Sequence, residues 1–150
     1  MTRTMPGESS VTISSRAYRT ISGCALRALP DECCGVLAGH GGTEAEILEA
    51  WELCNRAESN RSRRFVMDPA ELYAHTVRAR VLQLDVLGFF HSHPGGDALP
   101  SASDVREGSG WPGYVNAIYA FAPGEGAGRL RFYRTHPAYW REIPSKGVNP

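Results

Sequence analysis

The apolar run that ends in two histidines constrains this chain more than any other feature. The segment Val86–Phe90 is apolar and aromatic, which indicates a buried strand, and it leads directly into His91-Ser92-His93. Residues i and i+2 of a strand point to the same face of a sheet. His91 and His93 should therefore project together from the end of a buried strand, an arrangement that favours a metal site.

Asp104 is a candidate for a third ligand. It follows His93 after ten intervening residues, and the loop between them contains two glycines and two prolines, so the chain can turn back sharply. Catalytic zinc sites typically use three protein ligands and one water, whose pKa the metal lowers towards neutrality. These residues therefore predict one zinc ion per chain in a hydrolase, although iron and cobalt accept the same donors.

A water activated in this way needs a proton acceptor, and a carboxylate is the usual one. Glu32 is the candidate, because it stands at the start of Glu32–Gly39, an apolar stretch that indicates another strand. An acid at the entry to a buried strand requires an explanation, since burial of an unpaired charge is costly. We expect Glu32 to be the general base that takes a proton from the water and returns it to the leaving group.

In their order and spacing, these motifs resemble the JAMM (MPN-plus) metallopeptidase family, in its short prokaryotic form. The signature of that family is a glutamate upstream of H-x-H, then ten residues to an aspartate, with S-x-x-D at the end. The matching segments of this chain are Glu32 with Cys34–Gly39, Gly88–Pro94 and Pro100–Asp104. The resemblance extends over about residues 11–132.

The resemblance implies both a fold and a set of roles. The implied fold is an α/β sandwich of the cytidine-deaminase-like (MPN domain) type, a mixed β-sheet flanked by helices with the metal at the edge of the sheet. His91, His93 and Asp104 would bind zinc. Glu32 would activate the bound water, and Ser101 would help to stabilise the oxyanion of the tetrahedral intermediate.

Each candidate also has a purely structural interpretation. Asp104 can be an acid that the dipole of a helix N-terminus stabilises, and Ser101 can be a helix cap or a turn residue. The two histidines can be buried structural residues, and Glu32 an ordinary acid at a strand entry. The occurrence of all five in one order favours the metal site.

Composition limits the other possibilities. A chain of 150 residues is long enough for one domain with a single core. Its formal net charge of zero gives no indication of a nucleic acid or anionic membrane as partner. No apolar run is long enough to span a bilayer, and none in residues 1–10 resembles a secretion signal. The four cysteines form no C-x-x-C pair, which indicates reduced thiols in the cytoplasm. The resemblance implies that Cys34 is the cysteine of the family motif and packs rather than reacts.

Hydrophobic periodicity and turn residues predict the order of the elements. We expect a flexible N-terminus over residues 1–10, one domain over 11–144 and a flexible tail over 145–150. Strands are expected over residues 11–14, 32–39, 44–53, 65–67, 86–91, 114–121, 130–134 and 139–143. Helices are expected over residues 15–29, from Asp68-Pro69 onwards and from about Ser103, and a Gly-rich turn over Pro123–Gly128. The apolar face expected for the second helix consists of Ala70, Ala74, Val77 and Val81.

The resemblance to short prokaryotic members also implies a substrate. It would be a protein or peptide with a C-terminal Gly-Gly tail, such as a ubiquitin-like sulfur carrier, cut at the peptide or isopeptide bond after Gly-Gly. The basic loop Arg56–Arg64 is either a solvated loop or a contact for an acidic protein substrate. The sequence indicates neither an oligomeric state nor a pathway.

Three other classes of protein are alternatives. One is a non-catalytic protein-binding module of the same fold. Another is a zinc nucleoside deaminase, whose H-x-E and P-C-x-x-C motifs do not occur here. The third is a RadC-like protein, and we expect no room in this chain for the additional helical region that such proteins usually have.

Overall fold

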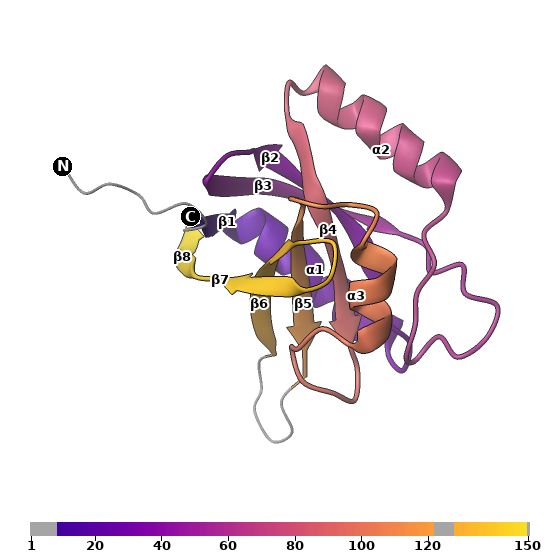
Figure 1. Cartoon of the computed structure of the whole chain (residues 1–150). Coiled ribbons are helices and arrows are strands. Elements are labelled where there is room, and N and C mark those ends of the chain that lie inside the picture. Colours follow the sequence, from indigo (N-terminus) through magenta and orange to yellow (C-terminus); the bar gives the residue numbers. More distant parts are fainter. Residues whose placement is uncertain (1–8, 122–127, 150) are drawn as a thin grey trace.

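The computed structural model describes residues 9–121 and 128–149 (Figure 1). The strands are β1 (Ser10–Ser14), β2 (Cys34–His40), β3 (Glu44–Leu53), β4 (Asp85–His93), β5 (Val115–Ala120), β6 (Arg129–Thr135), β7 (Trp140–Ile143) and β8 (Ser145–Asn149). The helices are α1 (Ser15–Ala28), α2 (Pro69–Val81) and α3 (Ala102–Gly108). Residues 1–8 of the expected N-terminal segment, and nearly all of the expected turn at residues 123–128, lie outside the described residues.

The two faces of the sheet have separate cores. Successive side chains of a strand alternate between faces, and β2 shows this directly. Leu37 belongs to the cluster that includes Ile21 and Ala25 of α1, whereas Val36 belongs to the cluster that includes Ala79 of α2. A mixed sheet with helices on both faces is the α/β sandwich that the sequence predicted, so the expected fold class is confirmed.

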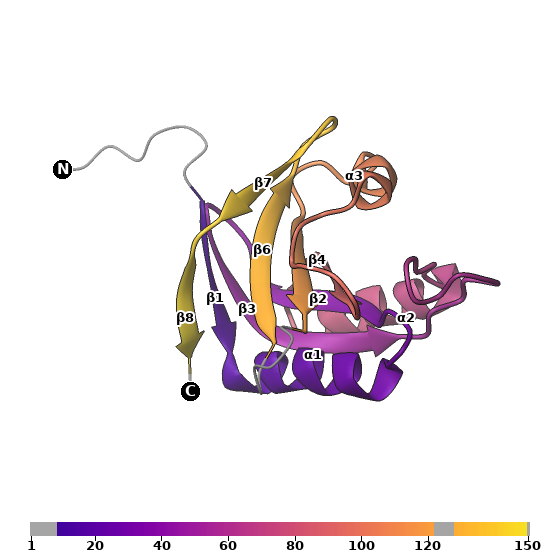
Figure 2. The ribbon, with the colours of Figure 1, turned by 90° about the horizontal axis from the view of Figure 1, so that it is seen from below.

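The order of the strands in the sheet is β7-β6-β5-β4-β2-β3-β1-β8. Strands β4 and β2 are therefore central, so the two histidines lie at the edge that the strand ends form and not beside the outer strands β7 and β8. Strands β7 and β8 lie at opposite ends of this order, yet only Pro144 separates them in the chain. Figure 2 shows the consequence: the sheet curls, and β7 and β8 pass as one band from β6 to β1.

The C-terminal segment differs from the expected flexible tail. Ser145–Asn149 forms β8 and pairs in parallel with β1, and the Lys146 ammonium contacts the Glu44 carboxylate. The sequence conceals this strand because it lacks alternating apolar residues. It instead forms backbone hydrogen bonds with the neighbouring strand β1. Any residue with an N–H and a carbonyl can form such bonds.

Two further local predictions are wrong. Phe65–Met67 is extended but forms no strand, because its neighbouring backbone groups bond to the loop at Asn55 and Arg56 rather than to a second strand. The expected apolar face of α2 is largely exposed, with Val77 at 44% and Val81 at 75%, while Ala79 is buried. Among the described residues, no helix has the length and apolar character needed to cross a membrane.

Candidate metal centre

Strand β4 delivers both histidines. It continues to His93, two residues beyond its expected end, and pairs with β2 on one side and β5 on the other. His91 faces Cys34 and Ile118 in the register and is fully buried, while His93 is partly buried at the strand end. The central position of β4 therefore fixes the backbone of both residues, so that their imidazoles enter the site on a rigid support.

The three predicted ligands converge on one point. His91 Nε2 lies 3.0 Å from His93 Nε2, and each of these atoms lies 3.2 Å from Asp104 Oδ2. Donors that hold zinc tetrahedrally at roughly 2 Å are themselves roughly 3.3 Å apart. The three atoms have the mutual spacing that a single zinc ion requires.

The protonation of His93 also fits a metal ligand. Its Nδ1 lies 2.7 Å from the carbonyl oxygen of Asp97, which can only accept, so Nδ1 carries the hydrogen and donates. In the neutral ring Nε2 then presents a lone pair towards His91 and Asp104. A second hydrogen bond of this kind commonly orients a metal-binding imidazole. Three converging acceptors repel one another unless a cation lies between them. The chemistry of these three side chains therefore fits a bound metal ion.

His91 has no such partner. Its Nδ1 is buried without a hydrogen bond among the described residues. Its ring instead packs against the ring of Phe65, with centroids 4.7 Å apart. The orientation of His91 is therefore held by packing and by strand pairing rather than by a hydrogen bond.

Helix α3 positions Asp104. Ser101 is its N-cap: the Ser101 Oγ accepts from the Asp104 N–H at 3.0 Å, and the Ser101 N–H donates to Asp104 Oδ2 at 2.8 Å. Burial alone would raise the pKa of the Asp104 carboxyl, but the adjacent rings of His91 and His93 and this N–H hold it well below its usual range. Asp104 is therefore an anion at neutral pH. The capping interpretation of Ser101 is confirmed, and it is compatible with a metal role for Asp104, which stays a prediction.

Glu32 lies next to the two imidazoles. One of its carboxylate oxygens and a ring nitrogen of each histidine all lie within 4.8 Å of one another. The residue is 5% exposed, and its Oε1 is buried without a hydrogen-bond partner among the described residues. Burial raises the pKa of Glu32 to about 8; the charge of His93 opposes this rise, and Asp104 and Glu107 add to it. Glu32 is thus a carboxyl that can exchange a proton near neutral pH.

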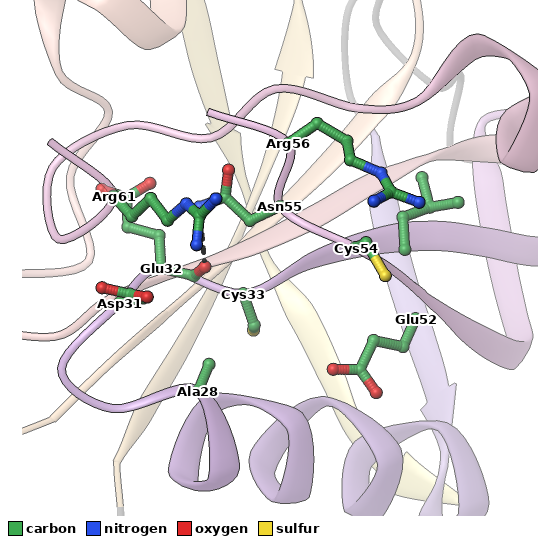
Figure 3. Close-up of a pocket in the computed structure, with 10 residues that line it drawn as sticks. Ala28, Asp31, Glu32, Cys33, Glu52, Cys54, Asn55, Arg56 and Arg61 are labelled. Atoms are coloured by element: carbon green, nitrogen blue, oxygen red, sulfur yellow. Dashed lines mark hydrogen bonds between the residues drawn. The ribbon is translucent and has the colours of Figure 1, made fainter. Parts of the chain in front are cut away.

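The backbone of Glu32 is held by the loop that follows β3. The Glu32 N–H donates to the carbonyl of Arg61 at 2.8 Å, and its own carbonyl accepts from Asn55 Nδ2 at 3.1 Å. Figure 3 shows Asn55 and Arg61 beside Glu32, around a cavity of about 370 Å³. The next residue, Cys33, is tied to β4, because its N–H donates to the buried hydroxyl of Ser92 at 2.8 Å. Hydrogen bonds to the loop and to β4 therefore hold the backbone of the general-base candidate in place.

Asn55 has a larger structural role than the sequence indicated. Its amide nitrogen donates to the carbonyls of Glu32 and Arg64, and its amide oxygen accepts from the N–H groups of Ala57 and Val66. Both N–H donors and both lone-pair directions of this side chain are thereby used: one bond joins the loop to Glu32 just before β2, and three hold the loop itself. Only the structure shows that this asparagine connects the loop to Glu32.

A groove passes over the metal centre. It has a volume of about 720 Å³, and its lining includes Glu32, His93, Ser101 and the Gly95-Gly96 turn. Arg63 of the basic loop also lines it. Two other arginines of that loop are engaged within the fold and do not lie free: Arg56 pairs with Asp68 at 3.4 Å, and the Arg61 side chain donates to the Ala57 carbonyl. An extended peptide laid in this groove would reach Glu32 and Ser101 together.

The cysteines next to Glu32 are not reactive candidates. Cys34 is fully buried, and burial raises the pKa of its thiol far above neutrality. Burial likewise raises the pKa of Cys33 to about 11. Reactive cysteines need an accessible thiolate, so both residues pack rather than react, as the sequence predicted for Cys34.

Comparison with known proteins gives one family. The sequence matches the profile of prokaryotic homologs of the JAB domain over residues 14–136. A desampylase from Haloferax volcanii is 39% identical over 89 residues, which are 59% of this chain and 62% of the relative. A desampylase from Pyrococcus furiosus is 35% identical over 81 residues, 54% of either protein. The chain thus spans less than two thirds of the length of these two relatives.

Solved structures show the same fold. A solution structure of a protein from Desulfitobacterium hafniense superposes with a TM-score of 0.81 at 26% identity, covering 93% of this chain and 94% of that one. A protein from Salinibacter ruber, also solved in solution, gives a TM-score of 0.66 at 26% identity, covering 93% and 91%. The agreement extends over nearly the whole length of all three chains.

Proposed function

This chain belongs to the JAMM (MPN-plus) family, among the prokaryotic homologs of the JAB domain, and from that premise we propose that it is a zinc-dependent metallopeptidase. The proposed reaction is hydrolysis of a peptide or isopeptide bond after the Gly-Gly tail of a ubiquitin-like or sulfur-carrier protein. The main support is the convergence of His91, His93 and Asp104 on one point beside Glu32.

In this proposal His91, His93 and Asp104 hold one zinc ion per chain. A bound zinc ion supplies a Lewis acid that lowers the pKa of water and polarises a carbonyl. The ligand set carries one negative charge, from Asp104, so the charge of the ion is only partly neutralised. The hydrogen bond from His93 Nδ1 to the Asp97 carbonyl keeps Nε2 available as a ligand.

Glu32 is the proposed general base. The attacking water gives a proton to the Glu32 carboxylate as its oxygen forms a bond to the scissile carbonyl carbon. When the C–N bond breaks, Glu32 returns that proton to the departing amine. Both transfers suit a carboxyl whose burial raises its pKa to about 8, because neither protonation state is strongly disfavoured near neutral pH.

Ser101 is the proposed oxyanion donor. Its Oγ accepts from the Asp104 N–H, so its own hydroxyl hydrogen can point into the groove that it lines. A preorganised donor at this position stabilises charge as it develops on the carbonyl oxygen. Its position at the N-cap of α3 ties this donor directly to the ligand Asp104.

The substrate class rests on the relatives and on the groove. Desampylases act on conjugates of ubiquitin-like proteins, and a groove that crosses the metal centre suits an extended tail. Glycine residues have no side chains and let an extended backbone approach a narrow site closely. The four cysteines are free thiols, which fits the reducing cytoplasm that we propose as its location.

Metal analysis combined with cleavage tests the proposal. We expect about one zinc per wild-type chain and cleavage of Gly-Gly conjugates of a ubiquitin-like protein. Glu32→Gln should keep the zinc and lose cleavage at least a hundredfold, whereas His91→Ala and Asp104→Ala should lose both. If the zinc-loaded wild type leaves these conjugates intact, the enzymatic proposal is wrong. Failure of the wild type to bind zinc at all would favour the non-catalytic binding module.

A further inference from the structure

A small cavity lies beside Asp104, between α3 and residues of β4, β5 and β7. Its volume is about 50 Å³. A water molecule takes up about 30 Å³ in the liquid, so this volume suits a water and not a substrate side chain. Phe65 and Trp140 belong to its aromatic walls, and Asp104, Glu107 and Asn116 are the polar side chains that line it.

The Trp140 indole brings an unpaired hydrogen-bond donor to this cavity. Its Nε1 is buried and has no partner among the described residues. The N–H lies against α3, because a Cβ at Gly108 would come within 2.9 Å of Nε1, and Gly108 follows Asp104 by about one helical turn. A buried N–H without a partner is unfavourable. The cavity therefore calls for a hydrogen-bond acceptor near Asp104.

Asn116 is a second polar group at the cavity that the fold does not otherwise explain. It is 5% exposed, and its side-chain amide makes no hydrogen bond to the described residues. Buried amides nearly always have a partner, either a protein group or an ordered water. The amide of Asn116 therefore needs a partner on the cavity side.

A third unpaired group, Nδ1 of His91, lies close to the same cavity. This atom is buried without a partner among the described residues. Two walls of the cavity flank the His91 ring, with centroid distances of 4.7 Å to Phe65 and 6.5 Å to Trp140. Asn116 faces the same side of the sheet as His91, since it pairs with Phe89, two residues before His91. The strand spacings put the Cα atoms of Asn116 and His91 roughly 8 Å apart, which suits a bridge through one water.

The chemistry of such a water matches these groups. A water accepts two hydrogen bonds and donates two. Asp104 is an anion at neutral pH and can only accept, and the amide oxygen of Asn116 also accepts. With both water hydrogens directed to these acceptors, its two lone pairs remain for the N–H groups of Trp140 and His91.

We propose that the small cavity holds one ordered water, through which Asn116 and Trp140 are positioning residues for the metal ligand His91. Packing holds the His91 ring in place but does not decide which nitrogen carries the hydrogen. A zinc ligand needs a free lone pair on Nε2, so the hydrogen must be on Nδ1, and an acceptor there selects this form. The water thus does for His91 what the Asp97 carbonyl does for His93. This inference rests on the proposed function only in assigning His91 to zinc, and it requires no particular substrate.

Competition with a chelator at neutral pH measures the zinc affinity of matched variants of the full chain. Trp140→Phe removes the indole N–H but keeps a ring, and Asn116→Leu removes the amide at similar volume. We expect each to weaken zinc binding about tenfold. Asn116→Asp keeps an acceptor and should bind zinc at least as tightly as the wild type. Trp51→Phe is the control, because its buried, unpaired Nε1 lies beside His75 instead, and its zinc affinity should be unchanged.

A second measurement detects the water without any metal. In nitrogen-15-labelled, metal-free protein, the indole proton of Trp140 should show a nuclear Overhauser cross-peak to a long-lived water. Trp140→Phe identifies this signal by its loss. Absence of the cross-peak in the wild type would overturn the proposal.

The outcomes separate this inference from the proposed function. Zinc binding by Trp140→Phe and Asn116→Leu as tight as that of the wild type would show that the positioning role is wrong. An equal loss of affinity in Trp51→Phe would also overturn it, since the effect would then come from general destabilisation. If the wild type binds zinc but cleaves no conjugate, the proposed function fails and this inference stands. If the wild type binds no zinc, the metal site and the positioning role both fail, and the cross-peak still decides whether the water is present.

Discussion

The burial of Glu32 leads to a quantitative prediction about stability. Replacing Glu32 by glutamine keeps the shape of the side chain and removes its ability to ionise. The folded protein holds this residue at 5% exposure with its Oε1 unpaired, and its pKa rises from the ordinary 4.5 to about 8, mainly because of burial. We therefore expect Glu32→Gln to stabilise the metal-free protein while abolishing its activity.

The magnitude follows from proton linkage. Above pH 4.5 the unfolded chain loses the Glu32 proton, but the folded chain keeps it until about pH 8, so the folded state binds more protons within this window. Stability then falls as pH rises through the window, by about 1.4 kcal/mol per pH unit. At pH 7 the cost amounts to about 3 kcal/mol, and at pH 5.5 to about 1.4 kcal/mol. Glutamine has no such cost, so the advantage of the variant should grow with pH.

Urea denaturation of chelator-treated protein at pH 5.5 and pH 7 measures this difference. Glu46→Gln serves as the control, because the same substitution at an exposed position should change the free energy of unfolding very little. Two results would refute the reasoning: Glu32→Gln no more stable than the wild type at pH 7, or an advantage equal at both pH values. Added zinc should reduce the advantage, since a nearby cation favours the carboxylate.

Three further substitutions test the support of the site. Asn55→Ala removes one hydrogen bond to Glu32 and three within the loop, and should lower the free energy of unfolding by about 2 kcal/mol in urea denaturation; an unchanged midpoint would contradict its role. Gly88→Ala should leave little soluble protein, because a Cβ there would overlap the Val115 backbone, whereas Gly110→Ala meets nothing within 4 Å and should fold normally. Ser101→Ala should lower stability by about 1 kcal/mol through loss of the α3 cap, and its zinc content, measured beside Ser101→Thr, shows whether the cap also holds the ligand.

Strong local signals made much of the fold predictable. The strand expected at residues 44–53 is found with the same bounds, because its apolar positions alternate and a Gly-Gly turn precedes it. The helix expected from Asp68-Pro69 begins there, with Asp68 as the N-cap. The convergence of the histidines with Asp104 was also predictable, since period-two geometry brings the first two together and the loop can return the third.

The errors arise where tertiary contacts outweigh local pattern. The sequence of β8 lacks a strand pattern, and its place is set by backbone pairing with β1. On α2 the expected apolar stripe remains exposed, because Ala79 and the partly buried Leu72 face the sheet instead. The small cavity beside Asp104 had no local signal at all, since Phe65, Glu107 and Trp140, which line it, are brought together only by folding. Contacts between residues so far apart in the sequence cannot be predicted from the spacing of motifs.

The charges around Glu32 explain why the burial of its carboxyl, which destabilises the fold, is useful for catalysis. Burial would lower the pKa of His93, but its bonds to Asp104 and the Asp97 carbonyl raise it above the ordinary value, so positive charge is favoured where these side chains converge. Glu32 meanwhile remains protonated at neutral pH. A dication bound by His91, His93 and Asp104 would bring positive charge next to Glu32 and shift this carboxyl towards its anion. The general base would then form only when the ligands are filled, so that an empty site does not leave a buried, unpaired carboxylate in the core.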